Sequence, residues 1–136
     1  MIIPDIPLDI YQREYREMFE KHNLKLSFLI TPQTSEERIK LIAAESTAFL
    51  YIVSSYATTG GKADIQKSQI AYFEKIQKMN LNVPTLIGFG ISNQKTFETA
   101  CQYANGAIIG SAFVKALKNG KEPKSTVREF VASVLG

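Results

Sequence analysis

Short apolar runs alternate along the chain with segments whose apolar residues recur every three or four positions. The runs predict buried strands at residues 24–30, 48–54, 83–89 and 106–111. The other segments predict amphipathic helices, the first over residues 8–21 and the last over a C-terminal stripe. That stripe consists of Val127, Phe130, Val131, Val134 and Leu135. Because strands that alternate with crossover helices pair in parallel, this order predicts an α/β layer structure.

Local signals indicate where the helices begin and end. Thr34 followed by Glu37 fits a capping box, and Ser92 is the expected N-cap of a later helix. Asn23 can end the first helix in a left-handed conformation. The helical apolar spacing around Cys101 predicts that this side chain lies in the core.

Composition excludes several classes of function. The 136 residues, 45% of them hydrophobic, suffice for one domain over residues 1–136. The net charge is +3, but the basic residues are scattered, so no nucleic-acid partner is expected. A single cysteine excludes a disulfide framework and favours a cytoplasmic location. No apolar run reaches the ~18 residues of a membrane span, and the only histidine, His22, has no second ligand nearby, so neither a membrane nor a metal is expected.

Three glycine-rich segments follow predicted strands: "TTGG" at 58–61, "GFGIS" at 88–92 and "IGS" at 109–111. In parallel β/α proteins, ligands bind among the loops at the carboxyl ends of the strands. Glycine lets backbone N–H groups approach an anion, and the N-terminus of the short helix predicted after Ser111 adds a favourable dipole. The pattern therefore predicts a phosphate site built mostly from main chain. The alternative is that these glycines serve only turns.

At these residues the sequence resembles the tryptophan synthase alpha chain. The similarity runs in order through "PDIP" at 4–7, "PQTSEERI" at 32–39, "YIVSSYATTGG" at 51–61, "PTLIGFGIS" at 84–92 and "GAIIGSAFVKAL" at 106–117. The family fold is a TIM (β/α)8 barrel of about 250 residues. The resemblance therefore implies that this chain is the C-terminal half of the barrel, from the end of strand 4 through strand 8 with their helices.

The resemblance also implies an activity. The family's enzyme is a lyase of tryptophan biosynthesis that cleaves indole-3-glycerol phosphate to indole and glyceraldehyde 3-phosphate by a retro-aldol step. Its two catalytic carboxylates lie upstream of Met1, so no catalytic residue is expected here and the chain alone should be almost inactive. No cofactor is expected, because pyridoxal phosphate would belong to the beta chain, the partner in the full enzyme.

The resemblance assigns binding roles by position. The residues expected to hold the phosphate are Gly60, Gly90, Gly110 and Ser111. Those expected to form the substrate pocket are Tyr51, Thr59, Phe89 and Ile108, with Ile2 and Leu29 as further contributors. Thr59 occupies the position of a mobile lid in the family, and Asp5 matches the aspartate of the strand-4 motif, where a structural role is expected.

A half barrel leaves two strand edges bare and its interior face uncovered. We therefore expect the chain to self-associate, to pair with the missing half, or to form a flattened, open sheet. Two other functions stay open at this point. The chain could be a non-catalytic half-barrel association module, or part of a different phosphate-binding TIM barrel.

Overall fold

The computed structural model describes residues 1–54, 67–88 and 90–136. Within them, four parallel strands form one sheet in the order β1 (Leu29–Ile30), β2 (Leu50–Val53), β3 (Thr85–Gly88) and β4 (Gly106–Ala107). The helices are α1 (Leu8–Ile10), the π-helical turn η1 (Tyr11–Tyr15), α2 (Arg16–Lys21), α3 (Glu36–Glu45), α4 (Lys67–Lys78), α5 (Gln94–Cys101), α6 (Ser111–Asn119) and α7 (Pro123–Leu135). The predicted α/β order with parallel pairing is confirmed. No helix of the described ranges is both long and apolar enough to cross a membrane.

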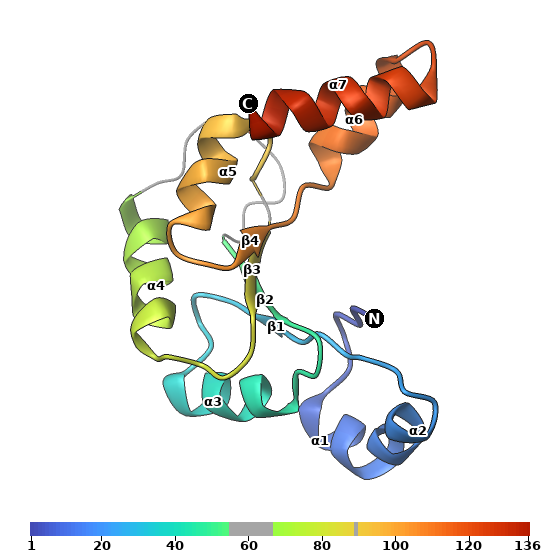
Figure 1. Ribbon diagram of the computed structural model, residues 1–136. Helices are drawn as coiled ribbons and strands as arrows, with labels where there is room; N and C mark the ends of the chain where they lie inside the picture. Colours follow the sequence, from blue (N-terminus) through green and yellow to red (C-terminus); the bar gives the residue numbers. More distant parts are fainter. Residues whose placement is uncertain (55–66, 89) are drawn as a thin grey trace.

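The helices are distributed unevenly around the sheet. In Figure 1, α3, α4 and α5 lie along one side of the strands, whereas α1–α2 and α6–α7 stand at the two ends. In the part of the chain that the structure describes, no helix covers the other face of the sheet. At the edge beside β1, Ile2 forms a single isolated parallel bridge to Ser27.

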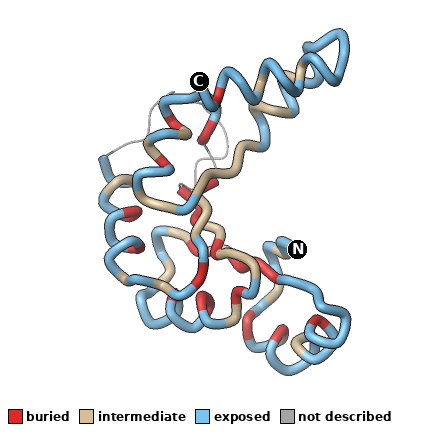
Figure 2. The backbone as a smooth tube through the Cα atoms, viewed as in Figure 1, coloured by how far each residue is buried: buried red, intermediate tan, exposed pale blue. Residues whose placement is uncertain are grey.

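The core fills the space between the sheet and its helices. Leu50 and Ile52 of β2 and Ile87 of β3 are almost completely buried. They pack in one cluster with helix residues such as Ile39 and Phe73. Figure 2 shows this as buried segments along the strands and on the inner sides of α3 and α4. The core of the described residues therefore lies on one face of the sheet.

The strand ladders are shorter than the apolar runs that predicted them. Residues 24–30 contribute only the two residues of β1 and the bridge at Ser27. Residues 106–111 contribute only the two residues of β4. An apolar run indicates which residues are buried, whereas a residue belongs to a strand ladder only where a neighbouring strand pairs with it. The apolar runs are therefore longer than the strands.

The first helix is continuous over the predicted range but contains a π-helical turn. The turn widens the spacing so that the backbone N–H of Arg16 bonds to the carbonyl of Tyr11, five residues back. As a result Tyr11 and Phe19 are buried and their rings meet edge to face, whereas Tyr15 is exposed. Asn23 follows with a φ of 51°, the left-handed conformation predicted for the helix end.

Two predicted helix caps are wrong by one residue. Ser35 rather than Thr34 caps α3, because the Thr34 hydroxyl already accepts the N–H of Thr31 in the preceding turn. Asn93 rather than Ser92 caps α5, and its side chain forms a reciprocal capping box with Thr96. In both cases the neighbouring residue has the better approach to the free N–H groups.

Cys101 is exposed, so its predicted place in the core is wrong. The helix α5 ends at this residue, and Ala100 takes the buried position beside it. The stripe predicted for the last helix is also mostly uncovered. Of its members Val134 is buried, whereas Val127, Val131 and Leu135 are exposed.

Candidate functional site

A row of side chains crosses the face of the sheet that carries no helix. Leu29 pairs with Tyr51, Tyr51 with Leu86, and Leu86 with Gly106. Residues paired across parallel strands project to the same face, and their chain neighbours Ile30, Ile52 and Ile87 belong to the core on the opposite face. The row is therefore the apolar lining of the uncovered face.

Tyr51 is the largest member of this row, and it leans toward the carboxyl ends of the strands. A Cβ added at Gly88 would lie 2.0 Å from the Tyr51 hydroxyl oxygen and 2.3 Å from Cζ. The ring therefore occupies the space that the missing side chain of Gly88 leaves open, as expected for a glycine that relieves crowding at a strand end. Burial raises the pKa of the Tyr51 phenol above its ordinary value of 10.0, so the hydroxyl keeps its proton at neutral pH.

Ile108 joins the same surface from the end of β4. Its N–H donates to the carbonyl of Ile87 at 2.8 Å. Its neighbours Ala107 and Ile109 pack against the core, which assigns Ile108 to the opposite, uncovered face. Of the residues predicted to form the pocket, Tyr51, Ile108 and Leu29 thus share one face.

Leu86 was missed by the sequence analysis although it lies between Tyr51 and Gly106 in the same row. The alternation of faces along "TLIG" carried the necessary information, because Ile87 faces the helices and its neighbour Leu86 must face the other side. That information becomes readable only once the face of one residue in the strand is known.

Gly90 and Gly110 follow two neighbouring strands, β3 and β4, at the same edge of the sheet. Gly90 has a φ of +79°, a conformation that L side chains rarely adopt. Among the residues that the structure describes, nothing lies within 4 Å of a Cβ built at Gly90 or at Gly110. The main chain at both positions is therefore open to a ligand.

The helix α6 begins beside these glycines without a capping side chain. Its N-cap is Gly110, and Ser111 is its first residue. The N–H groups of a first helical turn have no partner within the helix, and the helix dipole makes this end attractive to anions. The arrangement suits a phosphate group, with the Ser111 hydroxyl available as an additional donor.

Three predicted site residues, Thr59, Gly60 and Phe89, lie outside the described residues. At the opposite end of the sheet, Ile2 is exposed beside its bridge to Ser27, and Asp5 is exposed in the turn that follows.

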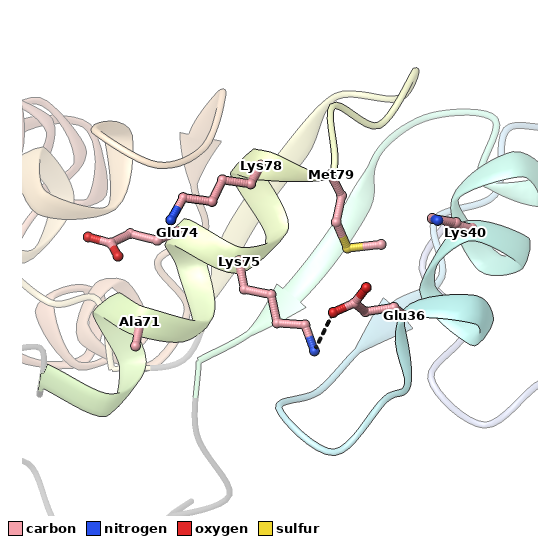
Figure 3. Close-up of a pocket in the computed structure, with 7 residues that line it drawn as sticks. All are labelled: Glu36, Lys40, Ala71, Glu74, Lys75, Lys78 and Met79. Atoms are coloured by element: carbon pink, nitrogen blue, oxygen red, sulfur yellow. Dashed lines mark ion pairs between the residues drawn. The ribbon is translucent and has the colours of Figure 1, made fainter.

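A groove of about 560 Å³ opens between α3 and α4, but it belongs to a different part of the molecule. Figure 3 shows its lining of charged side chains, in which Lys75 Nζ lies 3.2 Å from Glu36 Oε1. These helices pack on the core side of the sheet, behind the face that carries Tyr51. The groove is therefore not part of the surface that joins Tyr51 to Gly90 and Gly110.

Known proteins match the chain over its whole length. The family model of the tryptophan synthase alpha chain matches residues 1–135. The tryptophan synthase alpha chain of Parabacteroides distasonis is 49% identical over 134 residues, which are 98% of this chain and 52% of that protein. The corresponding protein of Flavobacterium psychrophilum is 51% identical over 135 residues, again 98% of this chain and 52% of that protein. The chain thus spans about half the length of these relatives.

The fold agrees with these matches. The tryptophan synthase alpha subunit of the hyperthermophile Pyrococcus furiosus superposes with a TM-score of 0.82 at 30% identity, over 99% of this chain and 54% of that chain. A solved tryptophan synthase α2β2 complex of the same organism, described in terms of mutual activation, gives the same score and coverage. The predicted half-barrel fold class is confirmed, and the chain belongs to the tryptophan synthase alpha chain family.

Proposed function

We propose that this chain supplies the substrate-binding half of a tryptophan synthase alpha site, the lyase that cleaves indole-3-glycerol phosphate to indole and glyceraldehyde 3-phosphate. One observation carries the proposal. The apolar row around Tyr51 runs toward the strand edge at which Gly90 and the uncapped start of α6 stand. An apolar surface that ends at an anion-binding edge matches a ligand with an aromatic ring at one end and a phosphate at the other.

Each part of the substrate has a place in this arrangement. The indole ring would lie against Tyr51, Leu29 and Ile108, where apolar contact and ring packing favour it. The phosphate would accept hydrogen bonds from the main chain at Gly90, Gly110 and Ser111. Gly60, Thr59 and Phe89 complete the proposed site and stay predictions.

The retro-aldol step itself requires proton transfers by positioned acid–base groups, which contribute about 10²–10⁴-fold each. We propose that the two carboxylates that the family resemblance implies lie outside the residues of this chain. We propose that the chain alone binds substrate but hardly turns it over. In the full enzyme it would act with a beta chain, as in the α2β2 complex of the Pyrococcus furiosus relative, and pyridoxal phosphate would belong to that partner. A cytoplasmic location stays a prediction based on the single cysteine.

Calorimetric titration with three ligands tests this function: a non-cleavable indole-alkyl phosphate, indole alone and inorganic phosphate. The indole-alkyl phosphate should bind tightest, because it engages both parts of the surface. The Ser111→Asp variant should lose the phosphate contribution through like-charge repulsion. A matched control is Leu41→Ser, since Leu41 is an exposed residue of α3 on the other side of the sheet.

The alternative functions predict different outcomes. In a fourth titration, with a sugar phosphate, affinity equal to that of the indole-alkyl phosphate would contradict the proposal and favour a different phosphate-binding barrel. No binding of any of the three ligands by the folded chain would favour a non-catalytic association module.

A further inference from the structure

The helix α6, whose first turn belongs to the proposed phosphate site, has few means of its own to hold its shape. It comprises nine residues, Ser111–Asn119, and no side chain caps its first turn. Isolated helices shorter than about 12–15 residues are marginal in water, so a helix of this length depends on packing against a neighbour. The N–H groups that α6 offers to an anion are therefore only as well placed as that packing makes them.

The helix α7, against which α6 packs, is better stabilised. It comprises thirteen residues and begins with Pro123, whose fixed φ suits the first position of a helix. The Glu122 carboxylate caps it by accepting the N–H of Lys124 at 3.1 Å and that of Ser125 at 2.7 Å. The helix α7 can therefore act as a support for α6.

Two contacts join these helices. In the turn between them, a Cβ added at Gly120 would lie 2.1 Å from Oγ1 of Thr126, so the Thr126 side chain fills the space beside that glycine. Further along, the rings of Phe113 and Phe130 lie 5.3 Å apart between centroids. Phe113 is the third residue of α6 and follows Ser111 by two positions. The ring contact therefore acts on the turn that a phosphate would approach.

The far end of α7 lies beside the start of α5. A Cβ built at Gly136 would lie 3.0 Å from Nε2 of Gln94, and Val134 is buried. Figure 1 shows α7 running from α6 to the upper end of α5. The helix α5 begins with Gln94, four residues after Gly90. By its packing, α7 thus connects the two helices that follow Gly90 and Gly110.

We propose that Phe130 is a positioning residue for the phosphate group of the substrate. It holds Phe113 and thereby the first turn of α6, and α7 fixes that turn relative to α5 and Gly90. An anion that accepts hydrogen bonds from two main-chain segments needs both at bonding distance at once, so its affinity depends on their relative placement. This inference rests on the proposed function, because it assigns a role in the same site.

Titration of the chain with the non-cleavable indole-alkyl phosphate and with indole alone tests this role. Phe130→Ala should raise the dissociation constant of the indole-alkyl phosphate about tenfold, because a charge-assisted hydrogen bond to the phosphate loses its alignment. The dissociation constant of indole should stay within about twofold, since Tyr51 and Leu86 belong to the sheet. A merely structural loss would weaken both ligands alike.

Two further variants control for effects on α7 itself. Phe130→Leu keeps an apolar side chain against Phe113 and should restore the affinity for the indole-alkyl phosphate to within about threefold. Val131→Ala changes the next residue of α7, which is 46% exposed, and should bind both ligands like the parent. In the described residues, neither ring of the Phe113–Phe130 pair belongs to the core cluster, and alanine favours helix, so circular dichroism should show an unchanged fold.

Hydrogen exchange supplies a readout that requires no ligand. The N–H of Val114 donates to the carbonyl of Gly110 at 3.0 Å and closes the first turn of α6. In Phe130→Ala this amide should exchange about tenfold faster, because the turn opens more often. The N–H of Tyr51, which donates to the carbonyl of Phe28 at 2.9 Å, should exchange at an unchanged rate.

The outcomes separate this inference from the proposed function. If the parent chain does not bind the indole-alkyl phosphate, the proposed function fails and the positioning role fails with it. If the parent binds this ligand and Phe130→Ala binds it equally well, only the positioning role is wrong. An equal loss for the phosphate ligand and for indole, or an unchanged exchange rate at Val114, would also overturn it.

Discussion

Gly88 is the position where one added methyl group best tests the geometry of the site. In Gly88→Ala the new Cβ would lie 2.0 Å from the Tyr51 hydroxyl oxygen, 2.3 Å from Cζ and 2.6 Å from Cε1. Carbon atoms make favourable contacts only at about 3.5–4.0 Å, so the ring must move by more than about 1 Å. The whole phenol would have to swing away from the strand edge, because three of its atoms are too close.

The cost follows from crowding at a packed position. Forcing a side chain out of its place costs about 1–3 kcal/mol of unfolding free energy. Urea denaturation followed by circular dichroism should show this as a lower midpoint with an unchanged slope. In the Tyr51→Leu background the shorter side chain leaves room, so the same alanine should cost less than about 0.5 kcal/mol.

Gly106→Ala is the matched control on the neighbouring strand. Its Cβ would meet only the Cδ2 atom of Leu86 at 3.0 Å, which is the end of a flexible side chain. It should change stability by less than about 0.5 kcal/mol. If Gly88→Ala is as stable as the parent, or costs the same with and without the Tyr51 ring, the ring does not occupy the space above Gly88 and the placement of Tyr51 described above is wrong.

Three further features are tested by substitution and urea denaturation. Gly90→Ala should destabilise the chain by about 1–2 kcal/mol because of its φ of +79°, even though nothing surrounds the new Cβ; Gly90→Asn, which tolerates this conformation better, should cost less. Asn93→Ala should cost about 1 kcal/mol, because the side chain that accepts the N–H of Thr96 at the helix start is lost. An equal loss in Ser92→Ala would show that Ser92, and not Asn93, caps the helix. The N–H groups of Ser125 and then Lys124 donate to the Glu122 carboxylate and hold its pKa below 4.5. The stability that this carboxylate contributes is therefore complete above that pH and is lost as the pH falls through the lowered pKa. Glu122→Gln should flatten the dependence of unfolding free energy on pH in this range, and an unchanged dependence would contradict the role of Glu122 as the cap of α7.

The order of the elements could be predicted because each apolar run is long enough to be buried and is bounded by clear breakers. Asn23 and Pro123 illustrate such breakers, since one takes the left-handed conformation and the other stands at the start of α7. The caps could not be resolved because adjacent residues offered equivalent hydroxyl or amide oxygens. Ser35 caps the helix instead of Thr34 because the Thr34 hydroxyl accepts a hydrogen bond from the N–H of Thr31. This hydrogen bond depends on the geometry of the turn, which residue propensities do not report.

The first helix shows a second limit. Its residues satisfy a period of 3.6 well enough to predict one helix with Tyr11 and Tyr15 on the same face. The π-helical turn shifts that register, so Tyr11 enters the core and Tyr15 does not. Nothing in the local sequence marks the extra residue in the turn, because its benefit comes from the packing of Tyr11 against Phe19 and Phe28.

The site residues were found mainly through the family resemblance, and the reason lies in the strands themselves. In a continuously apolar strand such as Leu50–Val53, alternate residues face opposite sides of the sheet, but all of them look alike in the sequence. Leu50 and Ile52 face the helices and belong to the core, whereas Tyr51 faces the other side and pairs with Leu29 and Leu86. Only the pairing register separates the two sets, because alternation needs one known face before it can be read.

This separation assigns the packing of the core and the proposed binding of a ligand to opposite faces of the sheet. The helix side of the sheet closes its core with the chain's own residues, among them Ile39, Phe73 and Ile87. The proposed binding face, with Tyr51, is formed by other residues of the same strands. Because different residues of the same strands carry these two tasks, the core and the proposed binding face can be perturbed separately.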